Sequence, residues 1–279
     1  MAVINTNTGS LYAQQAMTTN ARGLATVMQQ LSTGKRINNA VDDVAGMAIS
    51  TRLTSQIRGM NQAIRNTNDG ISLIQTAEGA TDQVTNMLQR MRELAVQASN
   101  DTNNSNDRSY LNLEFQSLTS QIDNIANYTQ WNGANVLNKT GGASGVFTFQ
   151  VGANSGQSIS ITFDNMTTAS GAGVLSSIAG NNITGTTSSS AALGVIISAL
   201  DTVSSARSNM GAVISRLQFT SDNLANVSAK AQESRSRIED TDYSQATTEL
   251  AKRNIIQQAA QAMLAQANQA PQSVLQLLR

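Results

Sequence analysis

Residues 53–74 read LTSQIRGMNQAIRNTNDGISLI, and their apolar side chains recur at steps of three and four. The row consists of Leu53, Ile57, Met60, Ile64, Ile71 and Ile74, with Thr67 filling its one gap. Such spacing places an apolar stripe along one face of a helix and favours a partner helix against it. We therefore predict a helix over residues 44–99, about 80 Å long if it is continuous.

A second stripe lies far away in the sequence, between residues 191 and 238. Its members recur every seventh residue: Ile196, Val203, Met210, Leu217 and Leu224, continued by Ala231 and Ile238. A third stripe, over residues 111–125, follows a turn at 100–106 and predicts a helix that returns antiparallel to the first. The expected fold class is mainly α, with a long antiparallel helical bundle or coiled coil formed by the N- and C-terminal segments. The residues expected in the helix core are Ile57, Ile64, Ile71, Leu118, Ile122, Val203, Met210, Leu217 and Leu224.

The middle of the chain changes from a helical to an alternating pattern. Two short runs, VFTFQV at 146–151 and SISITF at 158–163, alternate apolar and polar residues on either side of turn-forming residues. This pattern predicts a β-hairpin at about 146–163. Residues 166–190 are rich in Gly, Ser, Thr and Asn without a period, which indicates a short variable surface region.

These patterns divide the chain into three expected parts. Residues 1–40 and 240–279 are predicted to form a terminal coiled-coil domain. Residues 41–165 and 191–239 are predicted to form a helical core domain that carries the hairpin, and 166–190 is the variable region. The last helical pattern is expected to end at Pro271, the only proline in the chain, because proline interrupts a helix.

Composition excludes several classes of function. The 279 residues include 18 Lys and Arg, 18 Asp and Glu, and neither Cys nor His. Nucleic-acid binding needs a basic surface, so we expect no nucleic-acid partner. Thiolate nucleophiles, the commonest zinc ligands and the usual acid–base residue near neutral pH are missing. We expect no metal site, no cofactor and no enzymatic activity, whereas a net charge of zero permits dense self-association.

The start of the sequence differs from a secretory signal peptide. Residues 1–7 read MAVINTN, the first basic residue is Arg22, and no apolar segment intervenes. No stretch approaches the ~20 apolar residues that a membrane span needs. We expect no membrane span and, if the protein leaves the cell, a route without a cleaved signal.

Several motifs resemble those of bacterial flagellins. The segment LSTGKRINNA at 31–40, followed by DDVAG at 42–46, looks like the N-terminal signature of that family, and RMRELAVQA at 90–98 resembles its first core-domain helix. Further similar segments are WNG at 131–133, QVGAN at 150–154, SRIED at 236–240, LAQANQ at 264–269 with Pro271, and LLR at 277–279. The resemblance covers about residues 1–165 and 190–279, and the short middle leaves no room for large outer domains.

This resemblance implies a structural subunit that self-assembles into the hollow helical filament of the bacterial flagellum, outside the cell, for motility. It also implies export through the flagellar type III system without a cleaved signal peptide, with a flagellin export chaperone on the C-terminal segment. Other implied partners are the filament cap and the hook–filament junction proteins. The terminal segments are expected to be disordered in the monomer and to order on assembly. The residues expected to pack between subunits are Leu24, Leu31, Ile256, Leu264, Leu275, Leu277 and Leu278.

The resemblance further implies recognition by the host Toll-like receptor 5. The residues at the matching positions are Gln89, Arg90, Leu94, Gln97 and Glu114. They could instead form a solvated helix face or serve subunit contacts, and subunit packing is the favoured native role. The alternative function for the whole chain is a hook–filament junction protein, which shares the terminal architecture.

Many members of the family carry O-linked glycans. Here the candidate positions are Thr167, Thr168, Ser188 and Ser189, and the alternative is an unmodified loop.

Overall fold

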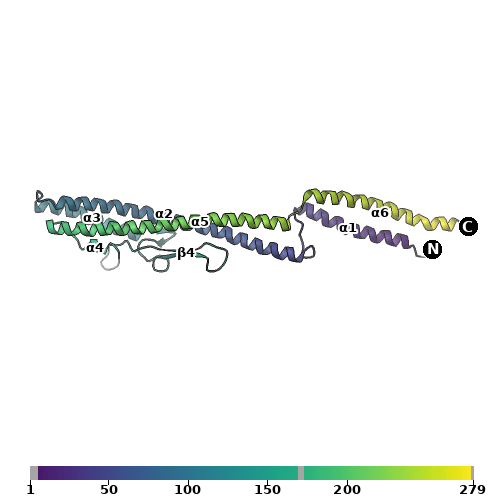
Figure 1. Cartoon of the computed structure of the whole chain (residues 1–279), viewed down its shortest axis with the longest axis horizontal. Helices are drawn as coiled ribbons and strands as arrows, with labels where there is room; N and C mark the ends of the chain where they lie inside the picture. Colours follow the sequence, from purple (N-terminus) through teal and green to yellow (C-terminus); the bar gives the residue numbers. More distant parts are fainter. Residues whose placement is uncertain (1–5, 169–172, 278–279) are drawn as a thin grey trace. The chain divides into compact units, whose positions relative to one another are not determined.

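A computed structural model describes residues 6–168 and 173–277, and of 270–277 it describes the backbone alone. The chain is mainly helical, as predicted (Figure 1). The helices are α1 Thr8–Thr33, α2 Val44–Ala98, α3 Ser105–Tyr128, α4 Ser176–Ala179, α5 Thr186–Glu239 and α6 Tyr243–Leu277. The strands are β1 Gln130–Trp131, β2 Ala134–Asn135, β3 Val146–Gln150 and β4 Ser158–Thr162.

The chain forms two compact units. One consists of residues 1–57 and 229–279, and the other of residues 58–228. Both divisions fall inside long helices, α2 and α5, rather than at the loops near residues 40 and 240 where the sequence pattern changes. Each unit is described below by itself.

In the unit of residues 58–228, α2 runs antiparallel to both α5 and α3. Arg207 of α5 pairs with Asp82 of α2 at 3.2 Å, and Ser228 lies 3.1 Å from Asn61. Between α3 and α2, Arg108 of α3 donates to the carbonyl of Ala98 at the end of α2. The helix α3, which carries the third predicted stripe, therefore returns antiparallel to α2, as the turn at 100–106 indicated.

The α5 stripe is buried as predicted, and the α2 stripe is buried in part. Val203, Met210 and Leu217 are at most 2% exposed, and Leu224 is half-buried. Of the other predicted core residues, Ile57 and Ile122 are buried, and Ile64, Ile71 and Leu118 are half-buried. Met60, Thr67 and Ile74 of the predicted α2 row are also buried, and so are the small residues Ala63 and Gly70 outside that row.

The β3–β4 hairpin explains why two positions of α2, Gly59 and Gly70, are glycine. The ring of Phe149 lies directly over Gly70, and Ala153 lies against Gly59, so a Cβ at either glycine would be crowded. Asn66 also donates to the carbonyl of Gln150 at 3.1 Å. The hairpin packs closely on this part of α2 and leaves little room for side chains. The periodicity of α2 alone cannot reveal such a contact.

Both hairpins follow from local turn chemistry. β1 and β2 are joined by Asn132 and Gly133, both with positive φ, at 48° and 79°. This left-handed backbone matches the twist of a two-residue hairpin and favours Asn-Gly. The predicted second hairpin is confirmed: β3 pairs antiparallel with β4, with Phe149 opposite Ile159.

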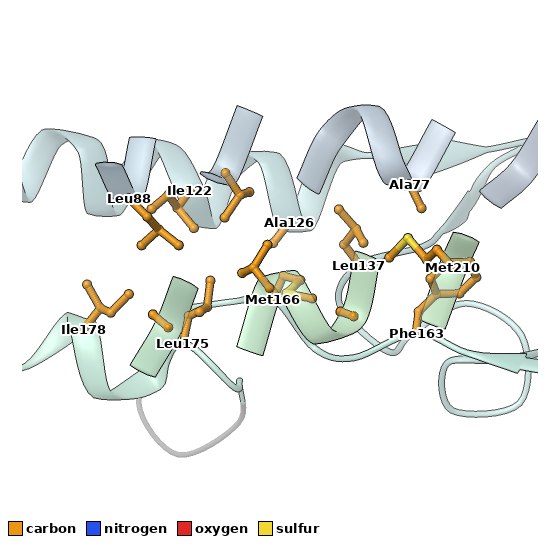
Figure 2. Packing of buried hydrophobic residues seen from close by; sticks show 14 of the residues in the cluster. Ala77, Leu88, Ile122, Ala126, Leu137, Phe163, Met166, Leu175, Ile178 and Met210 are labelled. Carbon is orange, nitrogen blue, oxygen red and sulfur yellow. The ribbon is translucent and has the colours of Figure 1, made fainter. Parts of the chain in front are cut away.

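The segment expected to be a variable surface region contributes to the core. Met166, Leu175, Ile178 and Ile183 are at most 1% exposed, and Figure 2 shows three of them facing Leu88, Ile122 and Ala126. Its apolar residues are too few and too irregularly spaced to produce a periodic signal. They are buried because this segment covers the side of the helices that α5 leaves open.

In the other unit, α1 and α6 pair with each other. Gly34 ends α1 with φ of 70° and donates its N–H to the carbonyl of Gln30. The predicted stop at Pro271 is wrong, since α6 continues to Leu277. Proline removes one backbone hydrogen bond and strains the preceding turn, but it does not forbid helical backbone on both sides.

One helix passes a composition test for a membrane span. Within α5, an 18-residue window has a mean hydropathy of 1.3, and a third of that window is buried. Ile196, Val203 and other apolar residues of α5 belong to the core of the unit of residues 58–228.

Candidate assembly interface

The α1–α6 pair has a thin apolar seam. In α1 only Asn20 and Val27 are buried, and the predicted packing residues Leu24, Leu31 and Leu264 are half-buried in this seam. They therefore pack within one chain as well as at any subunit contact. Leu275 and Leu277 lie in the part of α6 for which the structure describes the backbone alone. Leu278 lies outside the described residues.

Large apolar side chains remain exposed on both helices. Ile256 is 42% exposed, and Ile255, Met263, Leu11 and Met28 are between 56% and 67% exposed. From this group, the predicted packing residues included only Ile256. Exposed large apolar side chains are often found where a protein binds a partner.

A polar cluster joins the segment after α1 to the segment before α6. The N–H of Arg36 donates to the carbonyl of Glu239 at 2.6 Å, and the N–H of Thr241 donates to that of Gly34 at 3.0 Å. The Glu239 carboxylate also pairs with the Lys35 ammonium at 2.5 Å and accepts from the Ser50 hydroxyl. The hydrogen bond from Lys35, followed by that from Ser50, lowers the pKa of Glu239.

The predicted receptor residues form an exposed patch on α2 and α3, except for one. Arg90 of α2 bridges the two helices: its Nε lies 2.9 Å from Glu114 of α3, and its guanidinium also reaches Glu93 at 3.0 Å. The hydrogen bond to Glu114, and then that to Glu93, raises the pKa of Arg90. Gln89 and Gln97 are exposed on the same helix.

Leu94 does not lie on that patch. It is 1% exposed and belongs to the core row that includes Met91 and Ala98. Its side chain is buried in the core, because position 94 falls on the three-and-four spacing of the buried face of α2. It supports the patch and offers no surface to a partner.

The candidate glycosylation positions differ in access. Thr167 and Thr168 are 6% and 4% exposed, and Ser189 is fully buried. Thr168 donates its N–H to Asp123 at 3.1 Å, and Ser189 donates its hydroxyl to the carbonyl of Gly185 at 2.7 Å. A bulky glycan needs a surface hydroxyl, so only the half-buried Ser188 remains a candidate for modification without local opening.

Metal chemistry has no visible site in the described part of the chain. Across residues 6–168 and 173–277, no group of three or more acidic, His or Cys side chains could hold an ion.

Together these features define a structural, self-associating protein. Its long helices supply a core, and its paired terminal helices present apolar side chains that one chain leaves uncovered. Comparisons with known proteins agree with this class. Residues 4–141 match the bacterial flagellin N-terminal helical region, and residues 193–278 match the bacterial flagellin C-terminal helical region.

Individual relatives give the same result. A flagellin of Halalkalibacterium halodurans is 46% identical over 277 residues, which cover 99% of this chain and all of that relative. The crystal structure of Bacillus cereus flagellin superposes with a TM-score of 0.50 at 28% identity, over 57% of this chain and 88% of that chain. A putative flagellar hook-associated protein from Vibrio parahaemolyticus has a TM-score of 0.59 at 16% identity, over 71% of this chain and all of that chain, and so shares its fold.

The chain belongs to the bacterial flagellin family. It is a structural protein of the flagellar filament and not an enzyme. The predicted family is thereby confirmed.

Proposed function

We propose that this chain polymerises into the hollow flagellar filament through its terminal helices α1 and α6. The observation that carries the proposal is the exposure of Ile255, Met263, Leu11 and Met28 on a helix pair that already contains its own seam. Neighbouring subunits would cover these side chains. A head-to-tail contact that does not close into a ring generates an open helical assembly.

Order in the terminal helices is expected to depend on assembly. Their shared seam contains few large apolar residues, so an isolated pair gains little from burial. In this proposal α1 and α6 gain most of their stability when neighbouring subunits cover the exposed face. The free α6 would then be available to an export chaperone before assembly, and passage through the type III channel would need an unfolded terminal segment.

Seeded growth tests the assembly proposal. Purified full-length chain is added to short filament fragments and imaged by electron microscopy, together with the double variant Ile255→Asn and Met263→Asn. The full chain is expected to form long tubes with a central channel, and the double variant is expected to elongate seeds at least about tenfold more slowly, because it loses apolar burial at each contact. The exposed pair Gln258→Asn and Gln261→Asn is the matched control.

The same experiment distinguishes a filament subunit from the alternative function, a hook–filament junction protein. A hook–filament junction protein would add only a thin layer to each seed, and so would stop growing at saturating concentration. Elongation that proceeds normally in the Ile255 and Met263 variant would overturn the assembly surface proposed here. Contacts with the filament cap and with junction proteins would use the same exposed ends of α1 and α6.

Recognition by Toll-like receptor 5 is a second candidate function of the α2–α3 patch. The supporting observation is that Arg90 is held between Glu93 and Glu114, with Gln89 and Gln97 exposed beside it. A guanidinium that ion pairs already hold in one orientation loses little conformational entropy when it binds a protein partner. In receptor-expressing reporter cells, Arg90→Ala is expected to reduce signalling at least about tenfold.

The control for this experiment is Arg216→Ala, which removes an exposed arginine from α5. Unchanged signalling by Arg90→Ala would remove the patch as a receptor surface. Loss of filament growth in the same variant would instead show that the patch packs between subunits.

A further inference from the structure

An asparagine is buried in the middle of the α1–α6 seam. Asn20 is 6% exposed, and it is one of two buried residues in α1. Its side-chain amide donates to the backbone carbonyl of Arg253 in α6 at 2.9 Å. A second amide near the start of α1 repeats this arrangement, because Asn7 donates to the carbonyl of Ala267 at 2.7 Å.

The environment of Asn20 fits one alignment of the two helices. Gly23, on the next turn of α1, leaves space for the guanidinium of Arg253, and a Cβ at Gly23 would collide with it. Arg253 is held there by an ion pair with Glu249, with its Nε 3.0 Å from the carboxylate. Glycine does not recur one heptad away, since residues 16 and 30 are Ala and Gln.

The apolar part of the seam is too thin to fix the register firmly by itself. On α1 the large half-buried residues are Met17, Leu24 and Leu31, which recur every seven residues. On α6 Leu250 and Leu264 lie two heptads apart, with the half-buried Gln257 between them. A slip of one heptad, about 10 Å, therefore keeps the α1 row against the same face of α6 and exchanges leucine positions with a glutamine position.

We propose that Asn20, together with Gly23 and Arg253, sets the register of the α1–α6 pair. In a slipped pair the Asn20 amide would be buried without this acceptor, and Arg253 would meet a side chain where it now meets a glycine. A polar residue in an apolar seam specifies register in this way, at some cost in stability. The inference rests on the paired helices, and it deepens the proposed assembly because register fixes where the exposed apolar residues lie.

Cysteine pairs can measure the register, because the chain contains no cysteine of its own. The native pair is Gly9→Cys with Ala267→Cys, since a Cβ at Gly9 lies 3.9 Å from that of Ala267, within the range of a disulfide. The slipped pair is Gly9→Cys with Ala260→Cys, one heptad along α6 and about 10 Å away in the native register. Each pair is oxidised in the full-length chain, both on grown filaments and in the soluble chain, and intrachain bonds are read by gel mobility.

With Asn20 present, the native pair is expected to form at least about tenfold more than the slipped pair, and Asn20→Leu is expected to lower this ratio at least about threefold. Gly23→Ala provides a second variant that should lower the ratio, and Thr19→Leu, at an exposed position of the same helix, should leave it unchanged. An unchanged ratio in both Asn20→Leu and Gly23→Ala, or a ratio near one with Asn20 present in both settings, would overturn the register role. A high ratio in a chain that does not elongate seeds would overturn the filament proposal alone.

Discussion

The ammonium of Lys35 and the carboxylate of Glu239 form an ion pair at 2.5 Å, 204 positions apart in the sequence. The side chain of Glu239 is 15% exposed, and its carboxylate also accepts from Ser50. Beside it, the backbone of residues 34–36 bonds to that of 239–241. The two ends of the chain are therefore joined by backbone and side-chain bonds at the point where α1 ends and α6 is about to begin.

Acid is expected to weaken this junction. Because its partners lower the pKa of Glu239, the carboxylate binds protons more weakly in the folded protein than in the unfolded chain. Its stabilising contribution is complete above the ordinary pKa of a glutamate, near 4.3, and is lost as pH falls through the lower folded value. Thermal melting of the full chain followed by circular dichroism between pH 7 and pH 3 measures this loss.

The variant Glu239→Gln separates this carboxylate from the rest of the acid response. It should be less stable than the parent at pH 7, and the difference between the two should shrink toward pH 3. Glu78→Gln, on α2, is the control. A parent–variant difference that stays constant over this range would show that Glu239 ionisation does not stabilise the junction.

A charge placed in the seven-residue row of α5 tests the core of residues 58–228. Leu217 is fully buried, so Leu217→Asp would lose apolar burial and bury an unpaired carboxylate. We expect it to lower the free energy of unfolding by at least about 3 kcal/mol, measured by urea denaturation. Gln218→Asp, at the exposed neighbouring position, should change it by less than about 0.5 kcal/mol. Equal unfolding midpoints for the two variants would mean that the row is not a core.

The long helices could be predicted from sequence because their signals are local and repeated. The predicted helix at 44–99 corresponds to α2, Val44–Ala98, and the hairpin at 146–163 corresponds to β3 and β4. The second buried row of α5, formed by Ala192, Ala199, Ala206 and Val213, also recurs every seventh residue. It was missed because alanine gives a weak apolar signal, although the same spacing would have revealed it.

The candidate interface was less predictable, because its key contacts join distant residues. Nothing near Asn20 or Lys35 indicates a partner more than 200 positions away. Leu94 was assigned to a surface although its spacing to Met91 and Ala98 already indicated the buried face. Thr167 and Thr168 were assigned to an open loop because an irregular segment gives no sign of the core that it covers.

Two glycines in α2 provide a matched test of how the β3–β4 hairpin packs. Gly79 has no atom within 4 Å of a Cβ position, whereas a Cβ at Gly70 would lie 3.0 Å from Cγ of Phe149. Gly79→Ala should raise the free energy of unfolding by about 0.5–1 kcal/mol, because alanine loses less backbone entropy in a helix. Gly70→Ala gains the same helical propensity but must push the Phe149 ring away.

We expect overpacking to dominate at Gly70, so that Gly70→Ala lowers the free energy of unfolding by about 1 kcal/mol. Urea denaturation of both variants and the parent measures the sign, and it should be opposite for the two glycines. Truncating the ring distinguishes the cause: in a Phe149→Ala background, Gly70→Ala should become stabilising, because only the helical propensity remains. If Gly70→Ala is equally destabilising with and without the Phe149 ring, the cost arises within α2, and the hairpin does not rest on this glycine as the structure indicates.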